Sequence, residues 1–199
     1  MWTRTHDVCF MGFMNARPLK NPEPRYHHGN LVLTAKDVAE AISFKKDKQG
    51  FTKALRQVKH WTDSGLLQII TDLETGSGVA REYEDEPTVM IAAILQELVL
   101  FGLTIDKMES IAARLYRDFE EGDPDDVFFA ALTGEFSGYL ALEFGVDSRG
   151  RLKLEKAHTF STAPDEPPLA ESLPKARSVL LLDLGAIADR ITWPGIEIT

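Results

Sequence analysis

The segment from Lys53 to Tyr83 constrains the fold of this chain most strongly, because it joins an amphipathic helix to a hairpin. At about 100° per residue, one face of a helix over residues 51–64 would carry Lys53, Arg56, Gln57 and His60. The opposite face is mainly apolar, and Gly65 is typical of the residue that follows a helix. A helix with this pattern packs against a protein body and leaves its polar face in solvent.

The residues after this helix predict a hairpin. Two short extended segments, 67–71 and 79–83, flank a polar tip over 74–78 that contains two glycines. Extended segments around a Gly-rich tip are typical of a β-hairpin, and glycine lets such a tip approach another molecule closely. We therefore expect residues 68–83 to form a protruding wing.

The flanking segments carry signals for further elements. Residues 31–33 predict a short strand that leads into a helix over 35–42. Pro87 suits the first turn of a third helix, which we expect to end near Gly102. A fourth helix over 104–119 has an apolar stripe at steps of three and four, which fits either the core or a dimer seam.

An acidic stretch with Gly122 and Pro124 predicts a domain boundary near residues 120–126. The elements expected beyond it are a helix over 127–136, strands over 139–146, 152–158 and 178–182, a short helix over 184–191 and a final strand over 193–199. Residues 147–150, Asp-Ser-Arg-Gly, predict the hairpin turn between the first two of these strands.

These elements predict an α+β fold in three parts. The first is a proline-containing extended arm over residues 1–30. The second is a helical domain with a wing over 31–121. The third is a small α/β module over 125–199, which would serve dimerisation or partner contact.

Charge is distributed unevenly along the chain. The formal net charge is −9, yet residues 43–60 hold six Lys or Arg side chains and only one acid. Residues 84–199 hold 10 basic and 22 acidic side chains. A local basic patch on an acidic body is typical of selective DNA-binding proteins, because the acidic remainder disfavours unspecific binding.

Side chains in the basic region have the chemistry to contact DNA. Arg56 can contact guanine bidentately, and Gln57 can contact adenine in the same way. Lys45, Lys46 and Lys48 suit phosphates, which position a protein on DNA without conveying sequence. A solvated, charged surface is the alternative interpretation of each of these residues.

Other chemistries find little support in the sequence. A single cysteine, Cys9, excludes an internal disulfide and a multi-thiolate metal site. No apolar stretch approaches 18 residues, so we expect no membrane span and a cytoplasmic protein. The chain has no phosphate-binding glycine loop before a helix, no nucleophile elbow and no histidine motif for a triad or a zinc site. We therefore expect no enzymatic activity, no cofactor and no metal.

The order helix, basic helix, hairpin, helix, helix resembles the MerR-type winged-helix family of transcriptional regulators over about residues 31–120. The phrases that carry the resemblance are His60-Trp61-Thr62-Asp63-Ser64-Gly65-Leu66-Leu67, Arg81-Glu82-Tyr83 and Phe101-Gly102-Leu103-Thr104-Ile105. In that family an aromatic residue followed by Gly-Leu-Leu ends the recognition helix, and an Arg-x-Tyr-like phrase ends the wing. The third phrase is similar to the family's junction between the next two helices.

The resemblance implies that the helix over 51–64 enters the major groove and that the wing over 68–83 flanks it on the DNA backbone. By position in the family pattern, Arg56, Lys59 and His60 would be recognition-helix contacts, and Arg81 and Tyr83 would contact phosphate. The full set of candidate DNA-binding residues is Lys45, Lys46, Lys48, Lys53, Arg56, Gln57, Lys59, His60, Arg81 and Tyr83.

The chain also departs from the family pattern. The connection over 43–50 looks longer and more basic than the family's tight turn between its first two helices. The family's effector-binding cysteines have no counterpart, so sensing through a cysteine cluster is not expected. The helix over 104–119 is short for the family's dimerising coiled coil.

These features together predict a dimeric, sequence-specific DNA-binding regulator of transcription. Its expected partners are double-stranded DNA and a second copy of the chain, with RNA polymerase or another protein as a further candidate. Two alternatives stay open. One is a winged-helix interaction protein with an acidic protein partner, and the other is an excisionase-like or phage DNA-architectural protein that bends DNA without regulating a promoter.

Overall fold

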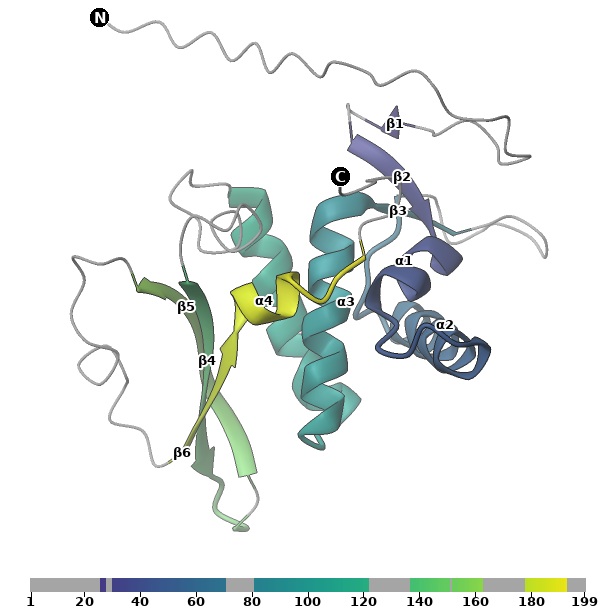
Figure 1. Ribbon diagram of the computed structural model, residues 1–199. Helices are drawn as coiled ribbons and strands as arrows, with labels where there is room; N and C mark the ends of the chain where they lie inside the picture. The colour runs from purple at the N-terminus through teal and green to yellow at the C-terminus, as the bar shows by residue number, and fades with distance from the viewer. Residues whose placement is uncertain are drawn as a thin grey trace, which may run out of the picture.

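The computed structural model describes residues 26–27, 30–70, 81–121, 137–150, 152–162 and 178–192. The elements are β1 (Tyr26–His27), β2 (Asn30–Thr34), α1 (Ala35–Ile42), α2 (Lys48–Asp63), β3 (Glu82–Glu84), α3 (Asp85–Leu100), α4 (Ile105–Glu121), β4 (Ser137–Val146), β5 (Leu152–Thr162), β6 (Ser178–Asp183) and α7 (Leu184–Ala188). The fold is α+β, as predicted, with helices between and beside two small antiparallel sheets (Figure 1). No helix in this described part of the chain is long and apolar enough to cross a bilayer.

Helix α3 forms the centre of the molecule (Figure 1). Every side chain from Thr88 to Gln96 is buried, as expected for a helix that is apolar on nearly all sides. Helices α1, α4 and α7 and strand β2 all contact α3. The short helices of the N-terminal half and the C-terminal sheet are therefore assembled around one apolar helix.

The first sheet joins residues that are far apart in the sequence. Strands β1, β2 and β3 pair in that order, and the antiparallel register of β2 with β3 places Leu33 opposite Tyr83. The backbone N–H of Ile70 donates to the carbonyl oxygen of Glu82 at 2.9 Å. This bond links residue 70 to β3, but β3 pairs with β2 and residues 67–70 form no strand, so the predicted wing hairpin stays a prediction. The predicted tip over 74–78 lies outside the described residues, as do most of the arm over 1–30, the helix predicted over 127–136 and the tail over 193–199.

Helix α2 begins earlier than the sequence pattern predicts. It starts at Lys48 rather than near residue 51, because the carboxylate of Asp47 accepts a hydrogen bond from the Gly50 N–H at 2.6 Å and caps the helix. A side chain at Gly50 would collide with the backbone of Lys45, so glycine allows the chain to fold back tightly onto the first turn. The connection between the two helices is therefore residues 43–47 rather than the predicted 43–50.

The helix ends follow the sequence signals. Gly65 and Gly102 have φ angles of 74° and 77°, a backbone conformation that side chains disfavour and glycine adopts readily. After α2, the N–H of Leu66 donates to the carbonyl oxygen of Trp61 at 2.8 Å, which closes the last turn. The same turn directs Leu66 and Leu67 into the core, where both are buried.

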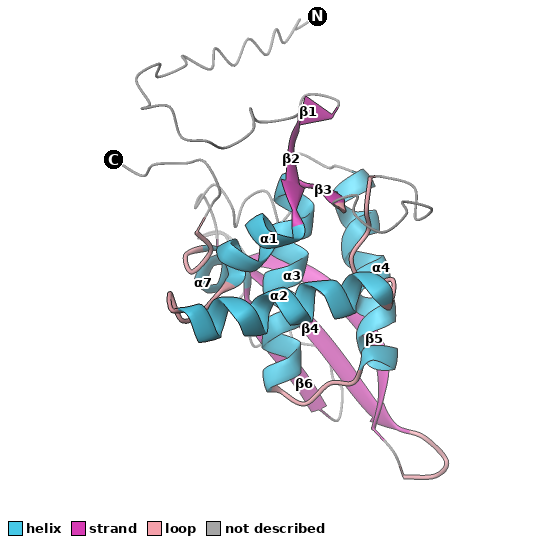
Figure 2. Ribbon diagram, turned by 90° about the vertical axis from the view of Figure 1, so that its right-hand side faces the viewer, coloured by secondary structure: helices cyan, strands magenta, loops and turns pink. Residues whose placement is uncertain are grey.

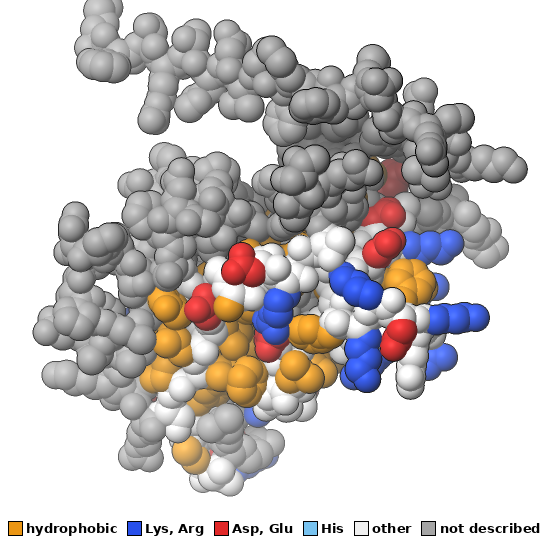
Figure 3. Space-filling model, in the orientation of Figure 1, with side chains coloured by type: hydrophobic (Ala, Val, Ile, Leu, Met, Phe, Trp, Pro, Cys, Tyr) orange, Lys and Arg blue, Asp and Glu red, His pale blue; other side chains and the backbone are white. Residues whose placement is uncertain are grey.

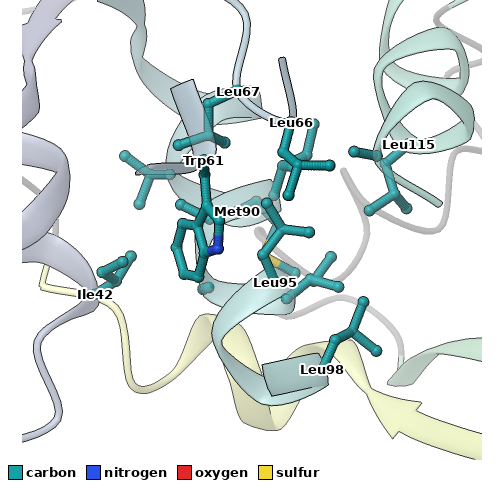
Figure 4. Close-up of a cluster of buried hydrophobic side chains, with 14 of the residues drawn as sticks. Ile42, Trp61, Leu66, Leu67, Met90, Leu95, Leu98 and Leu115 are labelled. Carbon is teal, nitrogen blue, oxygen red and sulfur yellow. The ribbon is translucent and has the colours of Figure 1, made fainter. Parts of the chain in front are cut away.

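The core is continuous across the N-terminal helices. Figure 4 shows Trp61 of α2 in a cluster with side chains from α1, α3 and α4. The other labelled members of this cluster are Ile42, Leu66, Leu67, Met90, Leu95, Leu98 and Leu115. Trp61 is 1% exposed, so it is a packing residue that anchors α2 to the body of the protein.

The C-terminal sheet has β4 in the centre, with β5 and β6 paired antiparallel on either side. The hairpin predicted at residues 147–150 is confirmed, and Gly150 has a φ of 76°. Leu140, Leu142 and Phe144 alternate along β4 on its core side and belong to the same cluster as Trp61. This C-terminal part therefore shares a core with the helices and is not a separate module.

Three further contacts join the C-terminal part to the helices and to the loop before α2. The N–H of Thr192 donates to the carbonyl oxygen of Ala41 at 3.1 Å. The guanidinium of Arg190 lies 2.7 Å from the carboxylate of Glu97 on α3 and stacks over the ring of Phe44, 5.3 Å from its centroid. The end of the described chain therefore packs directly beside the loop that precedes α2.

The apolar stripe of α4 is used inside the chain. Met108, Ile111, Ala112 and Leu115 are all buried, and α4 contacts α3 and β5. Of the two interpretations of this stripe, the structure supports the core. It does not supply the predicted dimer seam.

Because Tyr116 is buried, we expect the protein to lose stability at high pH. Its hydroxyl oxygen accepts a hydrogen bond from the Gln68 N–H at 3.0 Å, and burial raises the pKa of Tyr116 to about 12. Because the folded pKa lies above the unfolded value of 10.0, this contribution is fully present below pH 10 and is lost as the pH rises toward 12. We expect the free energy of unfolding in urea to fall by about 2–3 kcal/mol over that range.

The control for this prediction is Tyr116→Phe, which has no phenol to titrate at this position. Its stability should fall less with pH than that of the wild type, although burial also raises the pKa of Tyr83, which continues to contribute. Identical pH profiles for the variant and the wild type would contradict the prediction.

Candidate nucleic-acid interface

Helix α2 lies across the front of the molecule in Figure 2, with one face in solvent. Its buried residues are Ala54, Val58, Trp61 and Thr62, which recur at steps of three and four and form the inner face. The exposed basic side chains of the helix are Lys48, Lys53, Arg56, Lys59 and His60, and its exposed acid is Asp63 in the last turn. The structure therefore keeps the predicted polar face of this helix in solvent.

A shallow surface groove follows this face. The residues that line it are Lys48, Gln49, Thr52, Lys53, Arg56, Gln57 and His60. Among these described lining residues none is acidic. Figure 3 shows Lys and Arg side chains gathered on the side of the molecule that α1 and α2 form. The groove is thus open, positively charged and bordered by side chains that donate hydrogen bonds.

Gln57 takes an intermediate position on this face. It is partly buried, and its Oε1 atom has no hydrogen-bond partner among the described residues. Gln57 is nevertheless one of the residues that line the groove. A buried amide oxygen without a partner is unfavourable, and the side chain of Gln57 would have to turn outward before this oxygen could meet a ligand.

Arg81 lies at the other end of the helix, at the rim of the N-terminal sheet. Its Nη2 atom is 2.6 Å from Oδ1 of Asp63, at the last turn of α2. The side chain of Arg81 is 33% exposed and that of Asp63 is 60% exposed. Arg81 is therefore accessible to a ligand, but it is already paired with Asp63. The sequence pattern did not indicate this acid as part of the site.

The structure corrects the prediction for Tyr83. This residue is fully buried, and its hydroxyl forms a 2.8 Å hydrogen bond with that of Thr62. Burial also raises the pKa of Tyr83, so its hydroxyl stays protonated at neutral pH. Tyr83 therefore ties β3 to α2 from inside the protein and cannot reach a phosphate.

The structure also separates the three lysines around the start of α2. Lys48 lines the groove on α2. Lys46 is exposed, but its Nζ donates to the hydroxyl oxygen of Thr192 at 2.5 Å and so points toward the C-terminal segment. Lys45 is exposed, while its backbone carbonyl accepts from the Ser43 hydroxyl at 2.7 Å. Only Lys48 of the three is thus part of the groove lining, and Lys46 is directed away from it.

A second groove lies beside the first, between α1, α2 and Arg81. The residues that line it are Thr34, Ala35, Lys36, Leu55, Lys59, Asp63 and Arg81. Sequence reasoning missed Lys36, which is exposed in the first turn of α1. Nothing in the local sequence marks Lys36 as a site residue, because it shares a groove with Arg81 only through the pairing of β2 with β3.

Comparisons of the chain with protein-family models and with curated proteins found no match. The resemblance to MerR-type regulators therefore rests on its sequence phrases alone.

Proposed function

We propose that the protein is a sequence-specific DNA-binding regulator of transcription, with an N-terminal winged helix in which α2 is the recognition helix. The observation that carries this proposal is the exposed cationic face of α2, opposite a face anchored in the core. Cationic and amide side chains on one rigid helix can contact both phosphates and base edges. The same residues on a mobile loop would bind DNA without holding a defined register.

The dimensions of α2 suit the major groove. A helix of 16 residues is about 24 Å long, and the major groove is about 12 Å wide and accepts an α-helix. Arg56 and Gln57 have the side-chain chemistry for guanine and adenine, whereas Lys48 and Lys53 suit phosphates. Arg81 would contact the backbone from the sheet side, next to the segment that we expect to form the wing.

A homodimer is part of the proposal on grounds of affinity. A single small module gives limited affinity, and two copies on a two-fold-symmetric site would increase it. The stripe on α4 is buried within the chain, so a dimer would have to use another surface.

The test is selection of bound fragments from a pool of random duplex DNA with the full-length chain. We expect enrichment of one sequence, and an inverted repeat would also support the dimer. The matched control is the double variant Lys53→Glu, Arg56→Glu, which changes only exposed side chains and should enrich nothing.

Failure of the wild type to enrich any sequence would contradict the proposal. Capture of an acidic protein partner that survives nuclease treatment would then favour an interaction protein. Strong bending in a circular-permutation assay without sequence enrichment would favour an architectural DNA-binding protein.

A further inference from the structure

We propose that the groove between α1, α2 and Arg81 binds a phosphate of the DNA backbone, and that Asp63 occupies the Arg81 guanidinium until that phosphate displaces it. This inference rests on the proposed DNA-binding function, in which Arg81 already contacts the DNA backbone, and it describes the groove that takes the phosphate and the exchange that frees Arg81. It assigns roles to Lys36 and Asp63, which no sequence motif indicates.

The first argument is the charge of the groove. Lys36, Lys59 and Arg81 line it together with a single acid, Asp63. Ala35 and Leu55 add apolar residues to the lining. Three cations against one acid leave an excess of positive charge, and the volume of about 490 Å³ accommodates a sugar-phosphate unit.

The second argument is that these cations come from three elements held in fixed positions. Lys36 is in the first turn of α1, and Lys59 is on α2 one turn before Asp63. Arg81 directly precedes β3, whose Tyr83 is buried and bonded to α2 through Thr62. The backbone positions around the groove are therefore set by the core, and only the long side chains have to move.

The third argument is the Arg81–Asp63 pair itself. The two side chains meet at 2.6 Å and are one-third and three-fifths exposed, and ion pairs of this exposure contribute little to stability. A phosphate oxygen offers the same guanidinium a similar charge-assisted contact. Exchange of Asp63 for phosphate therefore costs little, while the pair keeps Arg81 at the groove in the free protein.

The groove is also placed where a DNA backbone would pass. Both grooves are lined in part by α2: His60 lines the first groove, and Lys59 lines the second. A recognition helix in the major groove has phosphates on both of its sides. A duplex bound along α2 would therefore bring one backbone toward Lys36, Lys59 and Arg81.

The test is a double-mutant cycle on the full-length chain with Asp63→Asn and Arg81→Gln, measured by fluorescence anisotropy on one duplex over a range of salt concentrations. Asp63→Asn should tighten binding about two- to fivefold when Arg81 is present and steepen the slope of log affinity against log salt by about one. In the Arg81→Gln background the gain should be smaller. The matched control, Asp106→Asn, removes an exposed acid of α4 and should leave both quantities nearly unchanged.

An equal or larger gain from Asp63→Asn in the Arg81→Gln background would overturn the inference, because it would show general charge repulsion rather than competition for Arg81. The side-chain Nε–H resonance of Arg81 gives an independent readout. A shift on adding duplex supports the site. Duplex binding that moves the α2 resonances but leaves Arg81 unmoved removes the site and retains DNA binding.

Free phosphate presents the same oxygens as a DNA phosphodiester, so pyrophosphate at constant ionic strength is the second probe. If the Arg81 resonance moves with pyrophosphate while no duplex binds, the assignment to DNA is overturned and so is the proposed function. If polyglutamate displaces bound duplex at equal charge concentration, the groove is a carboxylate site and the inference is wrong.

Discussion

Replacement of Arg56 by alanine should weaken binding to a selected DNA site by about 10- to 100-fold and relax the preference for one base pair. Arg56 is exposed near the middle of α2 and lines the groove on that helix. A bidentate arginine contact to guanine contributes discrimination as well as affinity, so the loss should be largest on the preferred site. Fluorescence anisotropy with the selected duplex and a scrambled duplex measures both effects.

The matched control for Arg56→Ala is Lys48→Ala, at the first position of the same helix. A lysine that contacts only phosphate should affect both duplexes equally and reduce the salt slope by about one. If both variants bind the two duplexes like the wild type, neither residue has the role that we assign to it. If Arg56→Ala weakens both duplexes equally, Arg56 is a backbone contact and another residue contacts the base.

Replacement of Trp61 by alanine should lower the free energy of unfolding by about 3–5 kcal/mol. Trp61 is 1% exposed and lies among apolar side chains from α1, α3 and α4. Its loss removes the anchor that holds the inner face of α2 against the core and leaves a cavity that its neighbours fill only in part. Urea unfolding followed by circular dichroism measures the change.

Trp61→Phe serves as the control, because it keeps an aromatic ring of smaller volume and should be destabilised less than Trp61→Ala. DNA binding well below the unfolding transition distinguishes anchoring from contact. Because Trp61 is internal, the folded fraction of either variant should keep the charge pattern of α2. A stability of Trp61→Ala within 1 kcal/mol of the wild type would contradict the anchoring role.

Most of the secondary structure could be predicted, because local signals and tertiary packing agree in this chain. The apolar spacing of α1, α2 and α4, the glycines at 65 and 102 and the hairpin at 147–150 all have local causes. The start of α2 was missed by three residues, because the Asp47 cap competes with an apolar pattern that begins only at Phe51. A capping acid is a single-residue signal and is easily outweighed by periodicity.

The candidate site could be predicted less completely. Helical periodicity was enough to place Arg56, Lys53 and His60 on one exposed face, since that requires only the geometry of a single helix. It was not enough for Tyr83, Lys46 or the Arg81–Asp63 pair. Each of these depends on what another element places beside the residue.

The sequence by itself determined which helix has a cationic outer face, because the helical repeat fixes the relative direction of side chains within one element. Only the tertiary structure decided that Tyr83 is internal, that Lys46 turns toward Thr192 and that the stripe of α4 is covered by α3 and β5. It also placed Lys36 and Arg81 in the lining of one groove, through the pairing of β2 with β3. The physical reason is that such contacts join residues tens of positions apart, and no local pattern specifies which distant surface will cover a given side chain.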